Sequence, residues 1–124
     1  MNDDLYREAI LDHNDHPRNF GELAGANVSA QQQNASCGDE ANVQLRVEDG
    51  IVRAVGFTGQ GCAISQAATS MVTERLIDMH VEDVLAMGEE DITELLGVTM
   101  SPMRMKCALL GLQTIQRGLR KQAR

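Results

Sequence analysis

Three cysteines and one aspartate are the residues of this chain whose types and spacing could do chemistry. Cys37 and Asp39 share a Ser-Cys-Gly-Asp turn, Cys62 follows a Gly-Gln-Gly segment, and Cys107 follows Arg-Met-Lys. A thiolate is both a nucleophile and a soft metal ligand. Three thiolates and one carboxylate therefore form a set of four ligands, which is enough to bind Zn²⁺ tetrahedrally or to hold one iron–sulfur cluster.

The charge and hardness of this ligand set indicate what it is suited to do. Four anionic ligands exceed the charge of a divalent ion, and Arg104 and Lys106, beside Cys107, are placed to offset the excess. The Asp39 carboxylate is a harder ligand than a thiolate, so it holds a thiophilic cluster less firmly. We therefore expect a site that is suited to releasing what it binds.

Cys62 is the cysteine least easily explained as a core residue. A lone cysteine is usually a small buried apolar residue, and Cys107 alone is equally well explained in that way. Cys62 instead falls where a strand pattern changes to a helix pattern, and the positive end of a helix dipole stabilises a thiolate. Gly59 and Gly61 carry no side chain that would block approach to its sulfur.

The composition predicts a single domain, residues 1–124, because a chain of this length buries one core. An odd number of cysteines without a Cys-x-x-Cys pair argues against a disulfide framework and against an ordinary zinc finger. A net charge of −7, with one tyrosine, two phenylalanines and no tryptophan, argues against a nucleic-acid partner. No signal-peptide pattern and no membrane-spanning apolar run occur, so we expect a cytoplasmic protein with no membrane partner.

Hydrophobic periodicity predicts the elements that must position these residues. Period-two alternation is strongest in Glu40–Glu48, and Asp49-Gly50 is a two-residue hairpin signal that leads into a partner strand. Ser101 and Pro102 are typical of an N-cap and of a first helical residue. The predicted elements are a helix over 3–13, strands over 28–33, 40–48 and 51–58, and helices that begin near 62, 81, 90 and 101.

This order of elements predicts an α+β fold, a small three-stranded antiparallel sheet with helices packed on one side. The first helix is predicted to bury its apolar stripe of Leu5, Tyr6, Ala9 and Ile10. His13 and His16 flank the end of that helix, where a helix-end or turn role explains them better than metal ligation. All three cysteines fall at element edges, where a rigid scaffold commonly carries functional residues.

Four segments, spread in order over nearly the whole chain, resemble the NifU/IscU/SufU family of iron–sulfur cluster assembly proteins. The Cys-Gly-Asp turn, the Gly-x-Gly-Cys-Ala-Ile-Ser element and the Arg-x-Lys-Cys-Ala helix start are specific to the family in combination, although each alone is a weak signal. The segments are LYREAILDHNDHPRNFG, NASCGDEANVQLRVEDG, GFTGQGCAISQAATSM and PMRMKCALLGL.

The resemblance implies a role for each of the four candidate ligands. Cys37, Cys62 and Cys107 match the three family cysteines, and Asp39 matches the fourth ligand or release residue. In the family this site receives sulfur from a cysteine desulfurase. It then builds a [2Fe–2S] cluster for apo iron–sulfur proteins, or it relays the sulfur as a persulfide.

The chain departs from both main branches of the family. Lys106 stands where the IscU-like branch has a histidine, and MSPMRMK stands in place of a Leu-Pro-Pro-Val-Lys motif, so the resemblance does not imply recognition by the specialised Hsp70 chaperone. The Arg-x-Lys-Cys form resembles the SufU branch, in which zinc occupies the site. SufU proteins also carry an insertion between the second and third cysteines that this chain lacks.

Three interpretations follow from these features. We favour a cluster assembly scaffold without turnover of its own, and the alternative is a zinc-dependent sulfurtransferase that relays persulfide sulfur. A purely structural zinc domain fits less well, because structural zinc sites are closed and Cys62 is expected to be accessible. The sulfur acceptor is Cys107 by resemblance and Cys62 by its position at a helix start.

Overall fold

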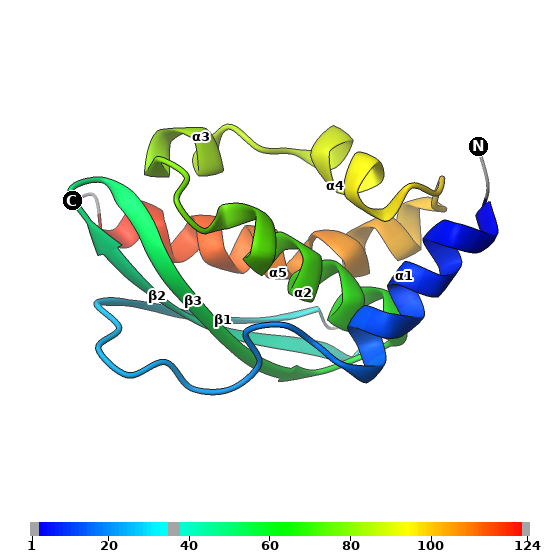
Figure 1. Cartoon of the computed structure of the whole chain (residues 1–124), viewed down its shortest axis with the longest axis horizontal. Helices are drawn as coiled ribbons and strands as arrows, with labels where there is room; N and C mark the ends of the chain where they lie inside the picture. The colour runs from blue at the N-terminus through cyan, green and yellow to red at the C-terminus, as the bar shows by residue number, and fades with distance from the viewer. Residues whose placement is uncertain (1–2, 35–37, 123–124) are drawn as a thin grey trace.

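The computed structural model describes residues 3–34 and 38–122, so the predicted ligand Cys37 lies outside the described residues. The described residues form eight elements (Figure 1), and every element predicted from the sequence is present within a few residues of its expected bounds. The elements are α1 (Asp3–Asp15), β1 (Val28–Asn34), β2 (Asp39–Glu48), β3 (Ile51–Gln60), α2 (Ala63–Leu76), α3 (Val81–Leu85), α4 (Glu89–Leu96) and α5 (Pro102–Gln122).

The three strands form one antiparallel sheet in the order β1-β2-β3. The turn between β2 and β3 is the predicted hairpin, since Asp49 and Gly50 both have positive φ angles, of 54° and 74°. A two-residue turn with positive φ at both central residues has a backbone twist that matches the right-handed twist of the flanking strands. On β2 the alternation also holds, because Ala41, Val43 and Leu45 are buried.

Helices cover one face of the sheet, as predicted, while the connection between α1 and β1 crosses the other face (Figure 1). α5 lies along β1 and β2, and α2 packs on both β3 and α5. The core between these layers consists mainly of aliphatic side chains, with Phe57 buried among them, which agrees with the scarcity of aromatic residues. Within the described residues no helix combines the length and the apolar character needed to cross a membrane.

α1 and α2 both differ from their predicted amphipathic patterns. The packing of α1 against α2 explains both differences. α2 is buried on more sides than its stripe predicts, because α1 covers one flank and α5 covers another. Ser65, Thr69, Ser70 and Thr73 are therefore buried as well. α1 contacts mainly α2, so a narrow stripe suffices; Ile10 is buried, but Ala9 is exposed, contrary to the prediction.

α2 and α5 approach each other closely at Gly111. This contact helps to determine the relative position of their N-terminal ends. A Cβ atom at Gly111 of α5 would lie 2.3 Å from the Thr69 Oγ1 atom of α2, so a larger residue does not fit without movement. Both helices run in the same direction, with their N-terminal ends on the same side of the molecule (Figure 1). Cys62 and Cys107 lie at these two N-terminal ends.

Candidate metal centre

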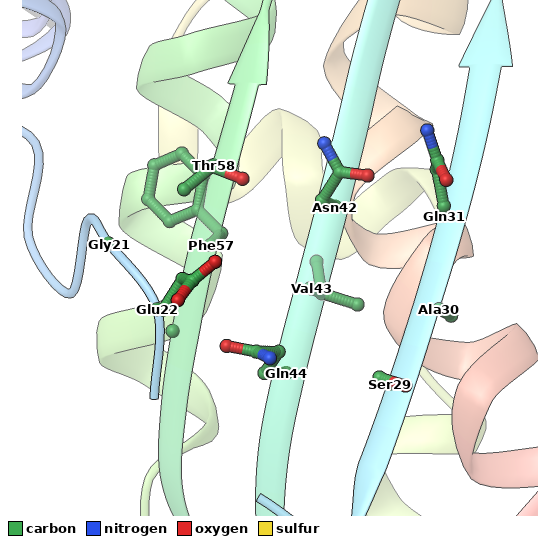
Figure 2. A pocket seen from close by; sticks show the side chains of 11 residues that line it. Gly21, Glu22, Ser29, Ala30, Gln31, Asn42, Val43, Gln44, Phe57 and Thr58 are labelled. Carbon is green, nitrogen blue, oxygen red and sulfur yellow. The ribbon is translucent and has the colours of Figure 1, made fainter. Parts of the chain in front are cut away.

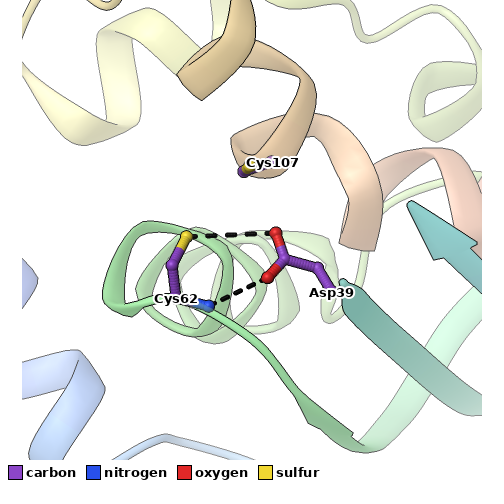
Figure 3. Close-up of side chains that lie close together, drawn as sticks. All are labelled: Asp39, Cys62 and Cys107. Atoms are coloured by element: carbon purple, nitrogen blue, oxygen red, sulfur yellow. Dashed lines mark hydrogen bonds between the residues drawn. The ribbon is translucent and has the colours of Figure 1, made fainter. Parts of the chain in front are cut away.

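Three of the four predicted ligands come together from three different elements. Asp39 is the first residue of β2, Cys62 is the N-cap residue of α2, and Cys107 lies in the second turn of α5. Their ligand atoms, one carboxylate oxygen and two Sγ atoms, all lie within 4.8 Å of one another (Figure 3). Each residue needs only a small displacement to share one metal ion.

The Asp39 carboxylate has a separate task for each of its oxygens. Oδ1 accepts a hydrogen bond from the Cys62 backbone N–H at 2.9 Å, while Oδ2 lies 3.9 Å from the Cys62 Sγ (Figure 3). The Cys62 side chain does not cap its own helix, and Asp39 on β2 binds the backbone N–H of this N-cap residue. A carboxylate at this position is favoured by the positive end of the helix dipole. One oxygen thus holds the start of α2 and the other faces the thiol.

Two glycines near Cys62 make room for this arrangement. A Cβ atom at Gly61 would lie 2.4 Å from the Asp39 Oδ1 and 2.8 Å from its Cγ, so a side chain here would displace the carboxylate. A Cβ atom at Gly59 would lie 2.2 Å from the Glu40 carbonyl oxygen, so a side chain there would prevent the close pairing of β2 with β3. The sequence predicted that these glycines keep the sulfur accessible. It did not predict that Gly61 positions Asp39, because that contact joins residues distant in the chain.

The two described thiols differ in their access to solvent. Cys62 is exposed, whereas Cys107 is 4% exposed and Asp39 is 1% exposed. The centre therefore opens through Cys62, and Cys107 and Asp39 line its inner side. Arg104 and Lys106, the predicted charge-offsetting residues, are both exposed within one turn of Cys107 on α5.

His13 lies in the seam between α1 and α2, away from the three ligands. Its Nδ1 atom is 2.7 Å from the Ser70 Oγ, and its Nε2 atom is 3.5 Å from a Glu74 carboxylate oxygen. The Arg18 backbone N–H donates to the same Ser70 Oγ at 2.8 Å. Burial of the ring lowers the pKa of His13 below its ordinary value. The helix-end role predicted for this histidine agrees with these contacts.

A shallow hollow of about 350 Å³ on the open face of the sheet does not include the centre (Figure 2). It lies between the connection at Gly21 and Glu22 and the polar side chains of the strands, among them Gln31, Asn42 and Gln44. None of the three converging ligands lines it. In the part of the chain that the structure describes, this hollow and the three converging side chains therefore lie at different places.

Comparisons with known proteins agree with this arrangement. The family described as NifU-like N terminal domain matches residues 5–124, so the chain belongs to this family and the sequence resemblance is confirmed. The chain is 38% identical to the iron-sulfur cluster assembly scaffold protein IscU of Thermotoga maritima, over 97% of this chain and 96% of that protein. It is 34% identical to the zinc-dependent sulfurtransferase SufU of Bacillus subtilis, over 97% of this chain and 92% of that protein.

A solved structure provides separate support for the fold. The N-terminal part of a nitrogen-fixing NifU-like protein from Brucella abortus superposes on this chain with a TM-score of 0.78. The match covers 96% of this chain and 94% of that one, at 21% sequence identity. The predicted α+β fold class is thereby confirmed.

Proposed function

We propose that this protein is an iron–sulfur cluster assembly scaffold. It accepts sulfur from a cysteine desulfurase, binds a nascent [2Fe–2S] cluster and transfers the cluster to apo iron–sulfur proteins. The observation that carries the proposal is the convergence of Asp39, Cys62 and Cys107 within 4.8 Å, in a chain similar to a protein named as such a scaffold. Reduced thiols fit a reducing compartment, so the proposed place of action is the cytoplasm.

The proposed ligands are Cys37, Asp39, Cys62 and Cys107. The thiolates supply soft ligands for iron, and the Asp39 oxygen supplies a harder and more easily exchanged one. Cys62 is exposed, so we propose it as the first sulfur acceptor, with Cys107 as the alternative that the family resemblance favours. The acceptor thiolate attacks the terminal sulfur of the donor's persulfide. The donor's S–S bond breaks, a new one forms, and the donor cysteine leaves as a thiolate without net oxidation.

A second function, zinc-dependent sulfur relay, is favoured by a specific observation. Lys106 occupies the position before Cys107, in the Arg-x-Lys-Cys form that resembles the SufU branch, and the chain is 34% identical to a protein named as a SufU sulfurtransferase. Zinc accepts the same cysteine and carboxylate ligands in a tetrahedral site. In this alternative the metal orders the centre and the product is a persulfide rather than a cluster.

Metal analysis distinguishes the two functions. The protein is purified without added metal, its metal content is measured, and it is then reconstituted anaerobically with iron, sulfide and thiol. Little zinc, with a cluster that forms and moves to an apo-ferredoxin, supports the scaffold. About one zinc per chain that resists iron supports the sulfurtransferase. A chain that takes up neither zinc nor a cluster contradicts both proposals.

Serine variants identify the sulfur acceptor. Cys62→Ser is expected to abolish persulfide transfer from the cognate desulfurase, and Cys107→Ser is expected to abolish it if the acceptor is the buried thiol. Persulfide formation is followed by mass spectrometry of the intact chain. Loss of transfer in Cys37→Ser alone contradicts both assignments.

A further inference from the structure

A groove beside the candidate metal centre has features of a docking site. It lies between α1 and the segment that leads into α5, which are neighbours at one end of the molecule (Figure 1), and its volume is about 470 Å³. Volumes in this range accommodate groups the size of several side chains. The groove is lined by Arg7, Ile10, Leu11, Ile64, Val98, Thr99, Met100, Ser101 and Arg104.

The groove adjoins both elements that carry the described cysteines. Ile64 follows Cys62 by two residues on α2, and Arg104 precedes Cys107 by three residues on α5. Neither cysteine lines the groove. A molecule held there would therefore lie next to the centre without occupying it.

One exposed apolar side chain lines this groove, and a second lies on the same helix turn as one of its lining residues. Leu11 lines it and is 51% exposed, and Met103, which precedes the lining residue Arg104, is 63% exposed. They are two of the four large apolar side chains that are exposed in the described part of the chain. Apolar surface of this kind beside a concave, partly apolar lining is typical of a protein interaction site.

The charge of the groove is opposite to that of the chain. The net charge is −7, yet the described side chains that line the groove include two arginines, Arg7 and Arg104, and no carboxylate. Among the side chains that the structure describes, neither arginine forms an ion pair. α5 also begins here, with the Ser101 Oγ accepting the Arg104 backbone N–H at 3.3 Å, so the positive end of a 21-residue helix adds to the field.

We propose that this groove binds an acidic, apolar segment of a partner protein. Aliphatic side chains of the segment lie on Ile10, Leu11 and Ile64, and its carboxylates pair with the two arginines. A concave surface does not fit a flat bilayer, and the negative charge of the chain as a whole opposes anionic lipid and nucleic acid. Binding itself is independent of the proposed function; the further statement that the partner delivers or receives sulfur or cluster at Cys62 rests on it.

Peptide selection tests the groove directly, because it does not require the partner to be identified first. Random peptides of about twelve residues, displayed on phage, are selected on the immobilised wild-type protein, since peptide-binding grooves recognise segments of this length. We expect enrichment of peptides that combine aspartate or glutamate with leucine, isoleucine, methionine or phenylalanine. Enrichment of basic or uncharged peptides, or no enrichment, overturns the proposal.

Charge reversal localises the binding of an enriched peptide. The double variant Arg7→Glu with Arg104→Glu is expected to weaken the peptide affinity by about tenfold or more, and Leu11→Ser is expected to weaken it as well. The control, Arg117→Glu with Arg120→Glu, makes the same change in net charge near the other end of α5 and is expected to have little effect. Equal affinity for the wild-type protein and the groove variants overturns the proposal.

Two further measurements separate this inference from its alternatives. Binding of the wild-type protein to vesicles of phosphatidylcholine and phosphatidylserine, lost in the groove double variant, would show that the surface serves a membrane and would refute a peptide groove. Zinc and cluster loading are measured on the same preparations. A wild-type chain that binds the acidic peptide but takes up neither zinc nor cluster would refute the proposed function and leave the docking proposal supported.

Discussion

Replacement of Gly111 by alanine tests whether the contact between α2 and α5 determines both stability and the geometry of the centre. A Cβ atom at position 111 would lie 2.3 Å from the Thr69 Oγ1 and 2.8 Å from both the Cβ and the Cγ2 of the same threonine. Rotation of the Thr69 side chain moves Oγ1 and Cγ2 but leaves its Cβ in place. The two helices must therefore move apart to accommodate the substitution.

The expected change in the free energy of unfolding follows from three contributions. Overpacking a buried contact costs about 1–3 kcal/mol. If Thr69 rotates, its 2.8 Å hydrogen bond to the Ser65 carbonyl is lost, at about 1 kcal/mol. Alanine is favoured over glycine inside a helix by about 1 kcal/mol, which opposes these costs. The lost hydrogen bond and the gain in helix propensity nearly cancel, so the steric overlap remains and we predict a net destabilisation of about 1–3 kcal/mol.

Urea denaturation of the metal-free protein measures this change, and zinc titration measures its effect on the centre. Because α2 and α5 carry Cys62 and Cys107 at neighbouring ends, Gly111→Ala is also expected to weaken zinc binding by about tenfold. Adding Thr69→Ala should recover part of the stability, since it removes the two closest movable atoms.

Gly88→Ala is a control for adding a methyl group without steric overlap, because a Cβ atom at position 88 meets nothing within 4 Å. Because Gly88 is the N-cap residue of α4, where alanine is less favoured than glycine, the control is expected to cost at most about 1 kcal/mol and to leave zinc binding unchanged. The packing argument is refuted if Gly111→Ala is as stable as the wild-type protein, or more stable by the amount that helix propensity alone predicts.

Three further predictions concern the centre and the seam between α1 and α2. Asp39→Cys supplies a fourth thiolate and should slow cluster transfer to an apo-ferredoxin; transfer at the wild-type rate would show that the carboxylate does not control release. Gly61→Ala should weaken zinc binding by about tenfold by displacing Asp39, with Gly88→Ala as the control, and unchanged affinity would contradict the positioning role. The pKa of His13 is lowered by burial, so the unfolded chain binds this proton more tightly than the folded chain. The His13 contribution to stability should be fully present above its ordinary pKa of 6.5 and be lost as the pH falls through the lowered value. Urea denaturation at a series of pH values measures it, and a pH dependence that is unchanged in His13→Gln would refute the assignment.

Local features of the chain were sufficient to predict the elements of this protein. Alternation over 41–45, the Asp49-Gly50 turn and the Ser101-Pro102 helix start depend on interactions among residues close in sequence, and all three occur as predicted. Residue type likewise indicated the chemistry, because thiolates and a carboxylate are the groups that hold zinc or iron. Asp39, Cys62 and Cys107 could thus be named as candidate ligands before their positions were known.

Tertiary structure alone decided how those residues meet. The burial of polar residues on α2, the exposure of Ala9 and the need for glycine at positions 61 and 111 depend on atoms contributed by distant segments. The same holds for the hydrogen bond from Cys62 to Asp39 and for the placement of Arg7 and Arg104 at one groove. Periodicity reports which side of an element is apolar, but steric overlap and charge proximity depend on distances between elements, which are determined only when the whole chain packs.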